Sequence, residues 1–173
     1  MAEVLQNTQA ALPEEPFASE DHPVSVHKEF TFPGNLDSLV SSREQVMDLI
    51  REHGCDEAGE VDLMIALQEA LANASLHGCG NDAGKSIACV VEIGPTAISI
   101  VVRDPGPGFD VRTIADPDRF STTTLEHGRG IALMRGMVDE VRFARGGSEV
   151  RLLKRMSCVA FSGLRDTDAP SGS

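Results

Sequence analysis

In the first half of the chain, the hydrophobic pattern predicts a strand followed by two helices. Residues 24–32 (VSVHKEFTF) alternate apolar with polar side chains, which is typical of a strand. Over residues 36–50 the apolar positions follow helical spacing, and Gly54 is expected to end that helix. A second helix is expected over residues 57–77, with Gly78 as its stop.

In the second half, the pattern predicts two hairpins separated by a loop and a helix. Residues 86–93 (SIACVVEI) and 96–103 (TAISIVVR) flank Gly94-Pro95, which indicates a hairpin turn. Residues 111–127 are polar and irregular, so we expect a loop or a mobile lid there. A third helix is expected to begin at GIALMRGMVDEV. The segments VRFAR and EVRLLKRM then form a last hairpin around a Gly-Gly pair.

This order of elements predicts an α+β fold, a two-layer sandwich in which helices cover a mixed, mostly antiparallel sheet. The 173 residues suffice for one domain with its own core, which we expect to cover residues 23–161. Residues 1–22 contain five acidic residues and neither Lys nor Arg, and they are expected to form a disordered tail. Residues 162–173 are expected to form a second one.

Composition and charge narrow the classes of function. The formal net charge of −12 argues against direct nucleic-acid binding, which depends on clustered Lys and Arg. No apolar stretch approaches the roughly 20 residues that span a bilayer, and no secretion signal is visible at the N-terminus, so we expect a cytoplasmic protein without membrane contact. Reduced structural thiols without metal-ligand spacing are expected at Cys55, Cys79, Cys89 and Cys158.

The first candidate motif is ALQEALANASLHGCG (66–80). Within it Glu69, Asn73 and His77 are each four residues apart, so a helix places them in one column. Their neighbours are nearly all apolar, and a buried unpaired carboxylate is costly, so the column should face either solvent or a ligand. If it faces a polar cavity, Glu69 could accept a proton and Asn73 could offer an oxygen to Mg²⁺.

The second motif is RDPGPGFD, where Asp104 follows a predicted strand and a glycine-rich loop begins. Gly106 and Gly108 would let a flat ligand approach the backbone, and the Asp104 carboxylate could accept a hydrogen bond from an exocyclic amine. Taken alone, the motif is better explained as an ordinary Pro/Gly turn with a solvated Asp.

The third motif is LEHGRGIALMRGM, in which Gly128 and Gly130 lead into an amphipathic helix. Free N–H groups at a helix start make an anion site, although the motif matches neither the P-loop nor the dinucleotide fingerprint. Alone, it is better explained as a flexible start of a helix. In combination, the three motifs supply a metal ligand, a base-recognition carboxylate, a lid and a phosphate site, which together make a complete ATP site.

With these spacings, the chain resembles the GHKL, or Bergerat-fold, superfamily of ATPases and kinases, which includes gyrase and the histidine kinases. Within it, the sequence is similar to the stand-alone anti-sigma factor serine/threonine kinases of bacteria, from Val24 to Lys154. EALANASLHG resembles the N box of that family, VRDPGPGFD its first glycine box and HGRGIALMRGMVDEV its second.

The resemblance implies roles for the residues that match these boxes. Asn73 would coordinate Mg²⁺ that bridges the phosphates of ATP, and Glu69 would be the general base. Asp104 would bind the adenine amino group, with Gly106 and Gly108 lining the base pocket.

The resemblance also covers four further positions of the boxes. Gly128 and Gly130 would let the lid and the following helix close on the phosphates. His77 and Arg129 also lie in the boxes, and Arg129 would either neutralise phosphate charge or remain solvated. Ala132 stands where many members of the superfamily have a third glycine.

As a function, the resemblance implies an ATP- and Mg²⁺-dependent serine/threonine protein kinase that regulates transcription. It would sequester a sigma factor and phosphorylate an anti-anti-sigma protein of the STAS type. Related kinases often pair, so the resemblance also allows a homodimer. One alternative is an ATP-gated sequestration module with little kinase activity. A histidine-kinase catalytic module or a gyrase-like ATPase fits less well, because the chain offers no further domain for either.

Overall fold

The computed structural model describes residues 23–53, 55–109 and 125–156, and the fold is built from these. The elements follow in the order β1 (Val26–Gly34), η1 (Leu36–Ser38), α1 (Leu39–Glu52), α2 (Glu57–Asn73), η2 (Ala74–Gly78), β2 (Asp82–Ile93), β3 (Ala97–Arg103), α3 (Leu125–Met137), β4 (Glu140–Ala144), η4 (Arg145–Gly147) and β5 (Glu149–Arg155). This confirms the predicted succession of strands and helices. Most of the predicted lid, residues 110–124, lies outside the described residues, as do both predicted tails.

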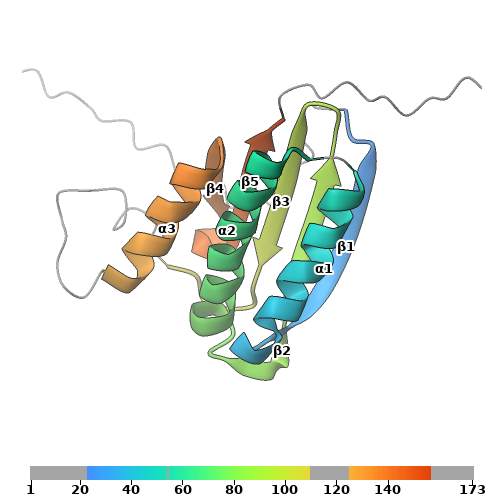
Figure 1. Ribbon diagram of the computed structural model, residues 1–173. Coiled ribbons are helices and arrows are strands. Elements are labelled where there is room, and N and C mark those ends of the chain that lie inside the picture. Colours follow the sequence, from blue (N-terminus) through green and yellow to red (C-terminus); the bar gives the residue numbers. More distant parts are fainter. Residues whose placement is uncertain (1–22, 54, 110–124, 157–173) are drawn as a thin grey trace, which may run out of the picture.

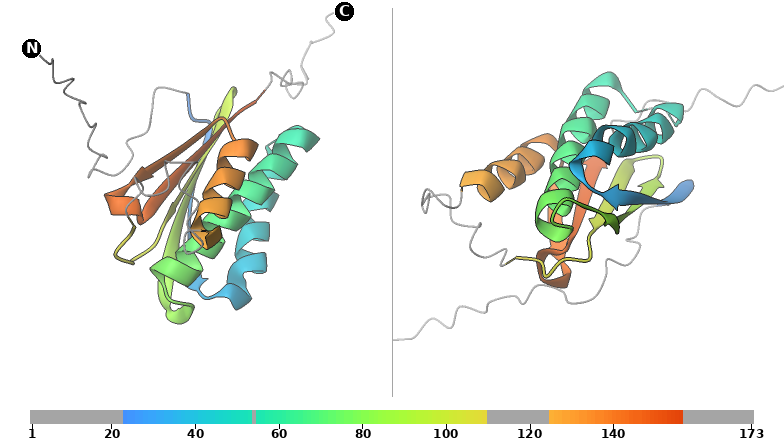
Figure 2. Two further views of the ribbon diagram at one scale, coloured as in Figure 1. Left: turned by 90° about the vertical axis from the view of Figure 1, so that its left-hand side faces the viewer. Right: turned by 90° about the horizontal axis from the view of Figure 1, so that it is seen from below.

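The strands form one sheet in the order β1-β2-β3-β5-β4. Every pairing in it is antiparallel, where the sequence had suggested a mixed sheet. The α-helices lie together on one face of this sheet (Figures 1 and 2). The predicted two-layer α+β sandwich is therefore confirmed.

The core lies between the helices and the sheet face that they cover. Ile98, Ile100 and Val102 alternate along β3 and point to this side, as the period of two in a strand requires. They meet the buried faces of α1 and α2, including Met47 and Leu67. Fully burying such aliphatic side chains contributes about 1.5–3 kcal/mol each, so aliphatic residues build this core with few aromatics.

Helix α2 carries the first candidate motif, and both of its ends have local causes. The Asp56 side chain accepts a hydrogen bond from the Gly59 N–H at 2.6 Å and caps the N-terminus. At the other end the α-helix stops at Asn73 and continues as a π-turn through Gly78. The predicted helix end near His77 is thus correct in position, although the last turn is wider than an α-turn.

The predicted start of the third helix at Gly130 is wrong, because α3 begins earlier, at Leu125. A glycine inside a helix costs about 1 kcal/mol relative to Ala, which weakens a helix without forbidding it. At Gly130 the glycine also lets α3 pack closely on α2, because a Cβ added there would lie 2.8 Å from Glu69 Oε2. The last residues assigned to the lid, 125–127, are therefore helical.

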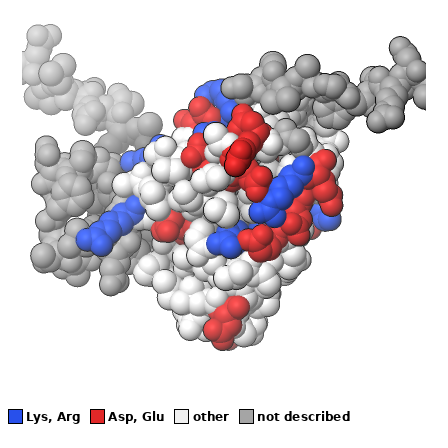
Figure 3. All heavy atoms as spheres, in the orientation of Figure 1, with Lys and Arg blue, Asp and Glu red and all other residues white. Residues whose placement is uncertain are grey.

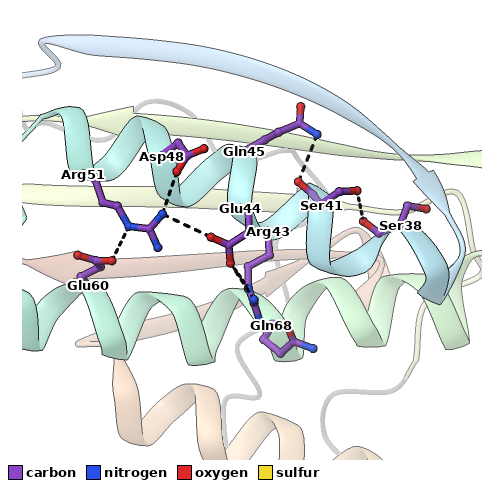
Figure 4. A network of polar contacts seen from close by, with 9 residues as sticks. All are labelled: Ser38, Ser41, Arg43, Glu44, Gln45, Asp48, Arg51, Glu60 and Gln68. Atoms are coloured by element: carbon purple, nitrogen blue, oxygen red, sulfur yellow. Dashed lines mark hydrogen bonds and ion pairs between the residues drawn. The ribbon is translucent and has the colours of Figure 1, made fainter.

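A network of polar side chains joins α1 to α2 on the outer surface (Figure 4). Arg51 lies between Asp48 and Glu60, at 2.8 and 2.6 Å, and Arg43 Nη1 donates to Gln68 Oε1 at 2.8 Å. In Figure 3 acidic and basic side chains are interspersed over the upper part of the helical face, and the lower part is largely uncharged. Exposed ion pairs of this kind contribute little to stability, so they mainly orient the two helices.

The described residues contain free thiols at Cys55, Cys79 and Cys89, as expected, and Cys158 lies outside them. Burial raises the pKa of the Cys89 thiol to about 12, so this thiol stays protonated at neutral pH. No group of three or more His, Cys, Asp or Glu that could hold a metal ion occurs in the described part of the chain. None of its helices is long and apolar enough to cross a membrane.

Candidate functional site

A pocket that is partly open to solvent lies where the end of α2 meets β3, α3 and the last hairpin. Asn73, His77, Asp104 and Gly108 from the sequence motifs line it. The other lining residues are Ala70, Ala74, Gly78, Val102, Phe109, Ile131, Met134, Phe143, Gly147, Ser148 and Val150. The fold thus brings together parts of the first two motifs and the helix of the third.

Asp104 follows directly after β3, and its backbone N–H donates to the Ser148 carbonyl on the neighbouring hairpin at 3.0 Å. Its Oδ1 accepts a hydrogen bond from the Gly106 N–H at 2.8 Å, whereas none of the described residues donates to Oδ2. Burial raises the pKa of this carboxyl, and the Gly106 N–H partly offsets the rise. One carboxylate oxygen is therefore left for a donor on a ligand.

Glycines let the backbone segments around Asp104 approach one another. A Cβ added at Gly78 would lie 2.1 Å from Cγ of Asp104, and one added at Gly106 would lie 2.6 Å from the Gly78 Cα. Real Cβ atoms do not tolerate such distances, so both positions need glycine to hold the Asp104 loop against the end of η2. These two glycines allow close contacts between backbone segments of the protein itself. The sequence had suggested instead that Gly106 lets a ligand approach the backbone.

At Gly108, both the backbone conformation and a close contact require glycine. Its φ of +74° lies in the left-handed region, and an added Cβ would lie 2.1 Å from the Gly146 carbonyl oxygen. The next residue, Phe109, donates its N–H to that same carbonyl at 2.8 Å. The loop after β3 is thereby fixed to the turn between β4 and β5.

The predicted column of Glu69, Asn73 and His77 is divided between two environments. Asn73 and the exposed His77 line the pocket, whereas the half-buried Glu69 lies one turn earlier, against Gly130. His77 belongs to the π-turn that continues α2, and it still lines the pocket together with Asn73. None of the described residues forms a hydrogen bond or ion pair with the side chain of Glu69 or Asn73.

The third motif lies on α3, beside this column. Gly130 is buried, and a Cβ there would lie 2.8 Å from Glu69 Oε2 and 3.5 Å from Asn73 Nδ2. Gly128 is part of the same helix, and Arg129 is exposed and is not among the described residues that line the pocket. The anion site was predicted at the start of the third helix. Because α3 starts at Leu125 and not at Gly130, this prediction now applies to Leu125, which follows residues that the structure does not describe.

An apolar wall of the pocket was missed in the sequence. Phe109 and Phe143 meet edge to face, with ring centroids 5.5 Å apart and an interplanar angle of 75°. Ile131 and Met134 of α3 are buried on the same pocket. The presence of Phe109 in the second motif was the only signal for this wall, because Phe143 reaches the pocket through strand pairing.

These groups suit a flat heteroaromatic ring that carries an exocyclic amine. Aromatic and aliphatic side chains offer contact to the faces of such a ring, and the free oxygen of Asp104 offers an acceptor for its amine. The Asn73 amide oxygen is a suitable ligand for a hard cation. The arrangement thus fits a nucleotide whose base carries an exocyclic amine and lies near Asp104.

Comparison with known proteins gives matches to one kind of domain. Residues 32–154 match the family model described as the histidine kinase-like ATPase domain. An anti-sigma F factor of Clostridium novyi (strain NT) is 29% identical over 103 residues, which are 57% of this chain and 72% of that protein. An anti-sigma F factor of Geobacillus stearothermophilus is 32% identical over 88 residues, which are 50% of this chain and 59% of that protein.

A solved structure with a similar fold is that of the RsbU and RsbW domains of Rv1364c from Mycobacterium tuberculosis. It matches with a TM-score of 0.55 and 18% identity, over 76% of this chain and 32% of that one. The matches therefore cover only part of each known protein. They confirm the resemblance that the three sequence motifs had indicated.

Proposed function

The chain belongs to the family of histidine kinase-like ATPase domains, and from this we propose that it is an ATP-dependent serine/threonine protein kinase that acts as an anti-sigma factor. It holds a sigma factor and phosphorylates a STAS-type anti-anti-sigma protein in a partner-switching circuit. The similarity to anti-sigma F factors supports this proposal. The observation that carries it is the pocket, which both Asp104 and Asn73 line.

Asp104 and the apolar wall bind the base. The Asp104 oxygen that receives no hydrogen bond from the described residues accepts one from the adenine amine, and Phe109 and Met134 exclude water from the ring. Burial of the carboxyl makes this hydrogen bond stronger than it would be in water. Adenine is thereby selected over bases that lack an exocyclic donor at this position.

Asn73 and Glu69 act at the other end of the nucleotide. Bound Mg²⁺-ATP supplies the phosphoryl group together with a cation that neutralises the phosphate charge. The Asn73 amide oxygen holds this cation. Glu69, one turn away on α2, accepts the proton of the Ser or Thr hydroxyl of the partner protein.

Phosphorylation of the anti-anti-sigma protein, which is the antagonist of this chain, explains how partners are exchanged. A phosphate adds about −1.5 to −2 charges at neutral pH. This protein itself carries a net charge of −12, so the added charge weakens its complex with the antagonist. The sigma factor is then bound again.

One observation favours a second candidate function, an ATP-gated sequestration module with little kinase activity. Glu69 is not among the described residues that line the pocket, and α3 lies against it at Gly130. In this arrangement nucleotide binding would change the surface presented to the sigma factor without rapid phosphoryl transfer.

Phosphotransfer by Glu69→Gln separates the two functions. STAS-type proteins from the same genome are incubated with radiolabelled ATP and either the wild type or the variant. We expect an acid-stable phosphoprotein whose rate of formation falls about 10²- to 10⁴-fold in Glu69→Gln, with unchanged ATP affinity. Glu57→Gln, in the first turn of the same helix, is the matched control and should retain the wild-type rate.

The outcomes of this experiment are distinct. Transfer at the wild-type rate by Glu69→Gln would show that Glu69 is not the base. ATP binding without transfer to any STAS-type protein would favour the sequestration module, and no ATP binding at all would contradict both functions.

A further inference from the structure

The sheet has a second face, opposite the helices, and part of it is buried. Strand β3 directs Ile98 and Ile100 into the core, so Ser99 points to the opposite side. On β5, Val150 and Leu152 belong to the core, so Arg151 also points outward, and its Nε donates to Ser99 Oγ at 2.9 Å. The left view of Figure 2 shows the sheet from its edge, with the labelled helices of Figure 1 on one side only.

Three polar residues on this outer face have almost no contact with solvent. Ser99 is 1% exposed, Glu149 1% and Arg151 3%. None of the described helices covers this side of the sheet. A charged Arg is almost never fully buried unless it is paired, so the centre of this face favours a segment that brings carboxylates over a segment that is only apolar.

The charge of this region is opposite to that of the protein. We call the outer patch the outward-facing residues of β3, β4 and β5 together with the η4 arginine that reaches Glu149. These are Ala97, Ser99, Val101, Arg103, Glu140, Arg142, Ala144, Arg145, Glu149, Arg151, Leu153 and Arg155. Five Arg and two Glu give the outer patch a formal charge of +3, while the whole chain carries −12.

Within the outer patch the arginines are crowded. Arg142 lies directly opposite Arg151 in the ladder between β4 and β5, where like charges repel, and it forms an ion pair with Glu140. Arg103 Nε approaches Glu149 Oε2 to 2.5 Å, and Arg145 Nε approaches the same oxygen to 3.3 Å. Additional carboxylates over the outer patch would lower the free energy of these cations.

The N-terminal segment has the matching chemistry. Residues 1–22 contain Glu3, Glu14, Glu15, Glu20 and Asp21 and neither Lys nor Arg. The segment lies directly before β1, and β5 is three strands away from β1 in the sheet, about 14 Å at a strand spacing of about 4.8 Å. An extended chain advances about 3.3 Å per residue, so the carboxylates near residue 14 can reach Arg151.

We propose that residues 1–22 fold back over the outer patch of their own chain and place their carboxylates against its arginines. The segment then acts as an electrostatic cover that keeps this face of the sheet away from other proteins. The C-terminal segment 162–173 complements the outer patch less well, since it carries one Arg and two Asp. Because the contacts are ionic and lie at the surface, salt weakens them.

Photo-crosslinking in the full-length chain tests this contact without altering the sheet. Phe17→p-benzoylphenylalanine places a photoreactive ring between the carboxylates of residues 15 and 20. The variant is irradiated as an equal mixture of unlabelled and ¹⁵N-labelled chains, and the adducts are located by mass spectrometry. We expect adducts within one chain, at outer-patch residues such as Val101 and Leu153.

Other adducts would overturn the proposal. Adducts on α1, α2 or α3, or no adduct to the sheet, would show that the segment does not cover the outer patch. Adducts between labelled and unlabelled chains would show that a second copy covers it instead.

A charge series on the same segment tests the electrostatic cause. Replacing the five acidic residues by Gln and Asn should lower the yield of the patch adduct about fivefold, as expected for several weak surface ion pairs. Exchanging Glu for Asp and Asp for Glu at the same positions preserves the charge and should preserve the yield. An equal yield in the neutral variant would overturn the ionic mechanism. Neither nucleotide nor partner protein is present, so the result is independent of the proposed kinase function.

Discussion

Among single residues, Asp104 offers the sharpest test of nucleotide binding. Its carboxylate receives one backbone hydrogen bond from the described residues and leaves Oδ2 for a ligand. Asp104→Asn preserves the shape and removes the charge, and a hydrogen bond to a charged group is worth about 1.5–3 kcal/mol. We therefore expect Mg²⁺-ATP to bind about 10- to 100-fold more weakly in calorimetric titrations.

The control for this titration is Asp82→Asn, an exposed carboxylate in β2 whose Oδ1 accepts from the Gly84 N–H. This variant should bind Mg²⁺-ATP as the wild type does. Equal affinity of Asp104→Asn and the wild type would contradict the base-binding role of Asp104.

Asp104 also links stability to pH. Its pKa is raised in the folded protein, chiefly by burial, so the folded state binds this proton more tightly than the unfolded state does. The charged carboxyl therefore lowers stability at neutral pH, and this cost disappears as the pH falls through the raised pKa. Asp104→Asn should be more stable than the wild type at pH 7, with the difference shrinking toward about pH 4, the ordinary carboxyl range.

Urea unfolding at a series of pH values measures this difference. A stability difference that is the same at pH 7 and pH 4 would mean that the gain in Asp104→Asn comes from something other than the carboxyl charge.

At the scale of elements, Gly130 sets how closely α3 approaches α2. Replacing it by Ala favours the helix by about 1 kcal/mol. The new Cβ would also lie 2.8 Å from Glu69 Oε2, the mobile end of that side chain, which must move. We expect Gly130→Ala to unfold with unchanged or slightly higher free energy while phosphoryl transfer to the antagonist falls, which urea unfolding and radiolabel transfer measure.

Gly136 provides the matched control on the same helix. It is exposed, and a Cβ there would meet nothing within 4 Å. Gly136→Ala should show a similar gain in stability, of about 0.5–1 kcal/mol, without loss of transfer. If both variants transfer phosphate equally well, the contact between Gly130 and Glu69 has no bearing on catalysis.

The type of an element could be predicted where it follows from neighbouring residues. Its boundaries could not be predicted where they depend on residues far away in the chain. The alternation in β3 and the helical spacing in α1 are properties of a few adjacent residues, so the sequence predicts them. Helix α3 contains two glycines, Gly128 and Gly130, that the local pattern places before a helix, and Gly130 packs against Glu69, which lies far away in the chain. The β2 strand begins at Asp82, before its apolar residues start, because this end pairs with Gly34 of β1.

The same distinction holds for the candidate site. The motifs around Asn73 and Asp104 are visible because unusual polar and glycine residues interrupt apolar segments. Phe143 and Ser148 reach the pocket only because β4 and β5 pair and β5 pairs with β3, and neither residue has a distinctive local pattern. The chemistry of the site could be predicted from the sequence, whereas its apolar wall required the fold.

At the scale of the whole molecule, the pocket connects elements from both halves of the chain. Asn73 of α2, Asp104 after β3, Met134 of α3 and Val150 of β5 all line it. A ligand that binds there contacts only the folded arrangement, because unfolding separates these residues. Nucleotide binding should therefore stabilise the domain as a unit rather than one element.

Thermal unfolding with nucleotide tests this coupling. Ligand at 100 times its dissociation constant adds about 2.7 kcal/mol to the free energy of unfolding. For a chain of 173 residues this corresponds to a rise in Tm of several degrees, since about 1 kcal/mol shifts Tm by about 2–4 °C in proteins of this size. The β strands and the helices should unfold at one shared, raised Tm, when followed by far-UV circular dichroism and by hydrogen exchange in β3 and α2. If only the amides of α2 and α3 gained protection, the nucleotide would be held by the helices alone, without the Asp104 side of the pocket.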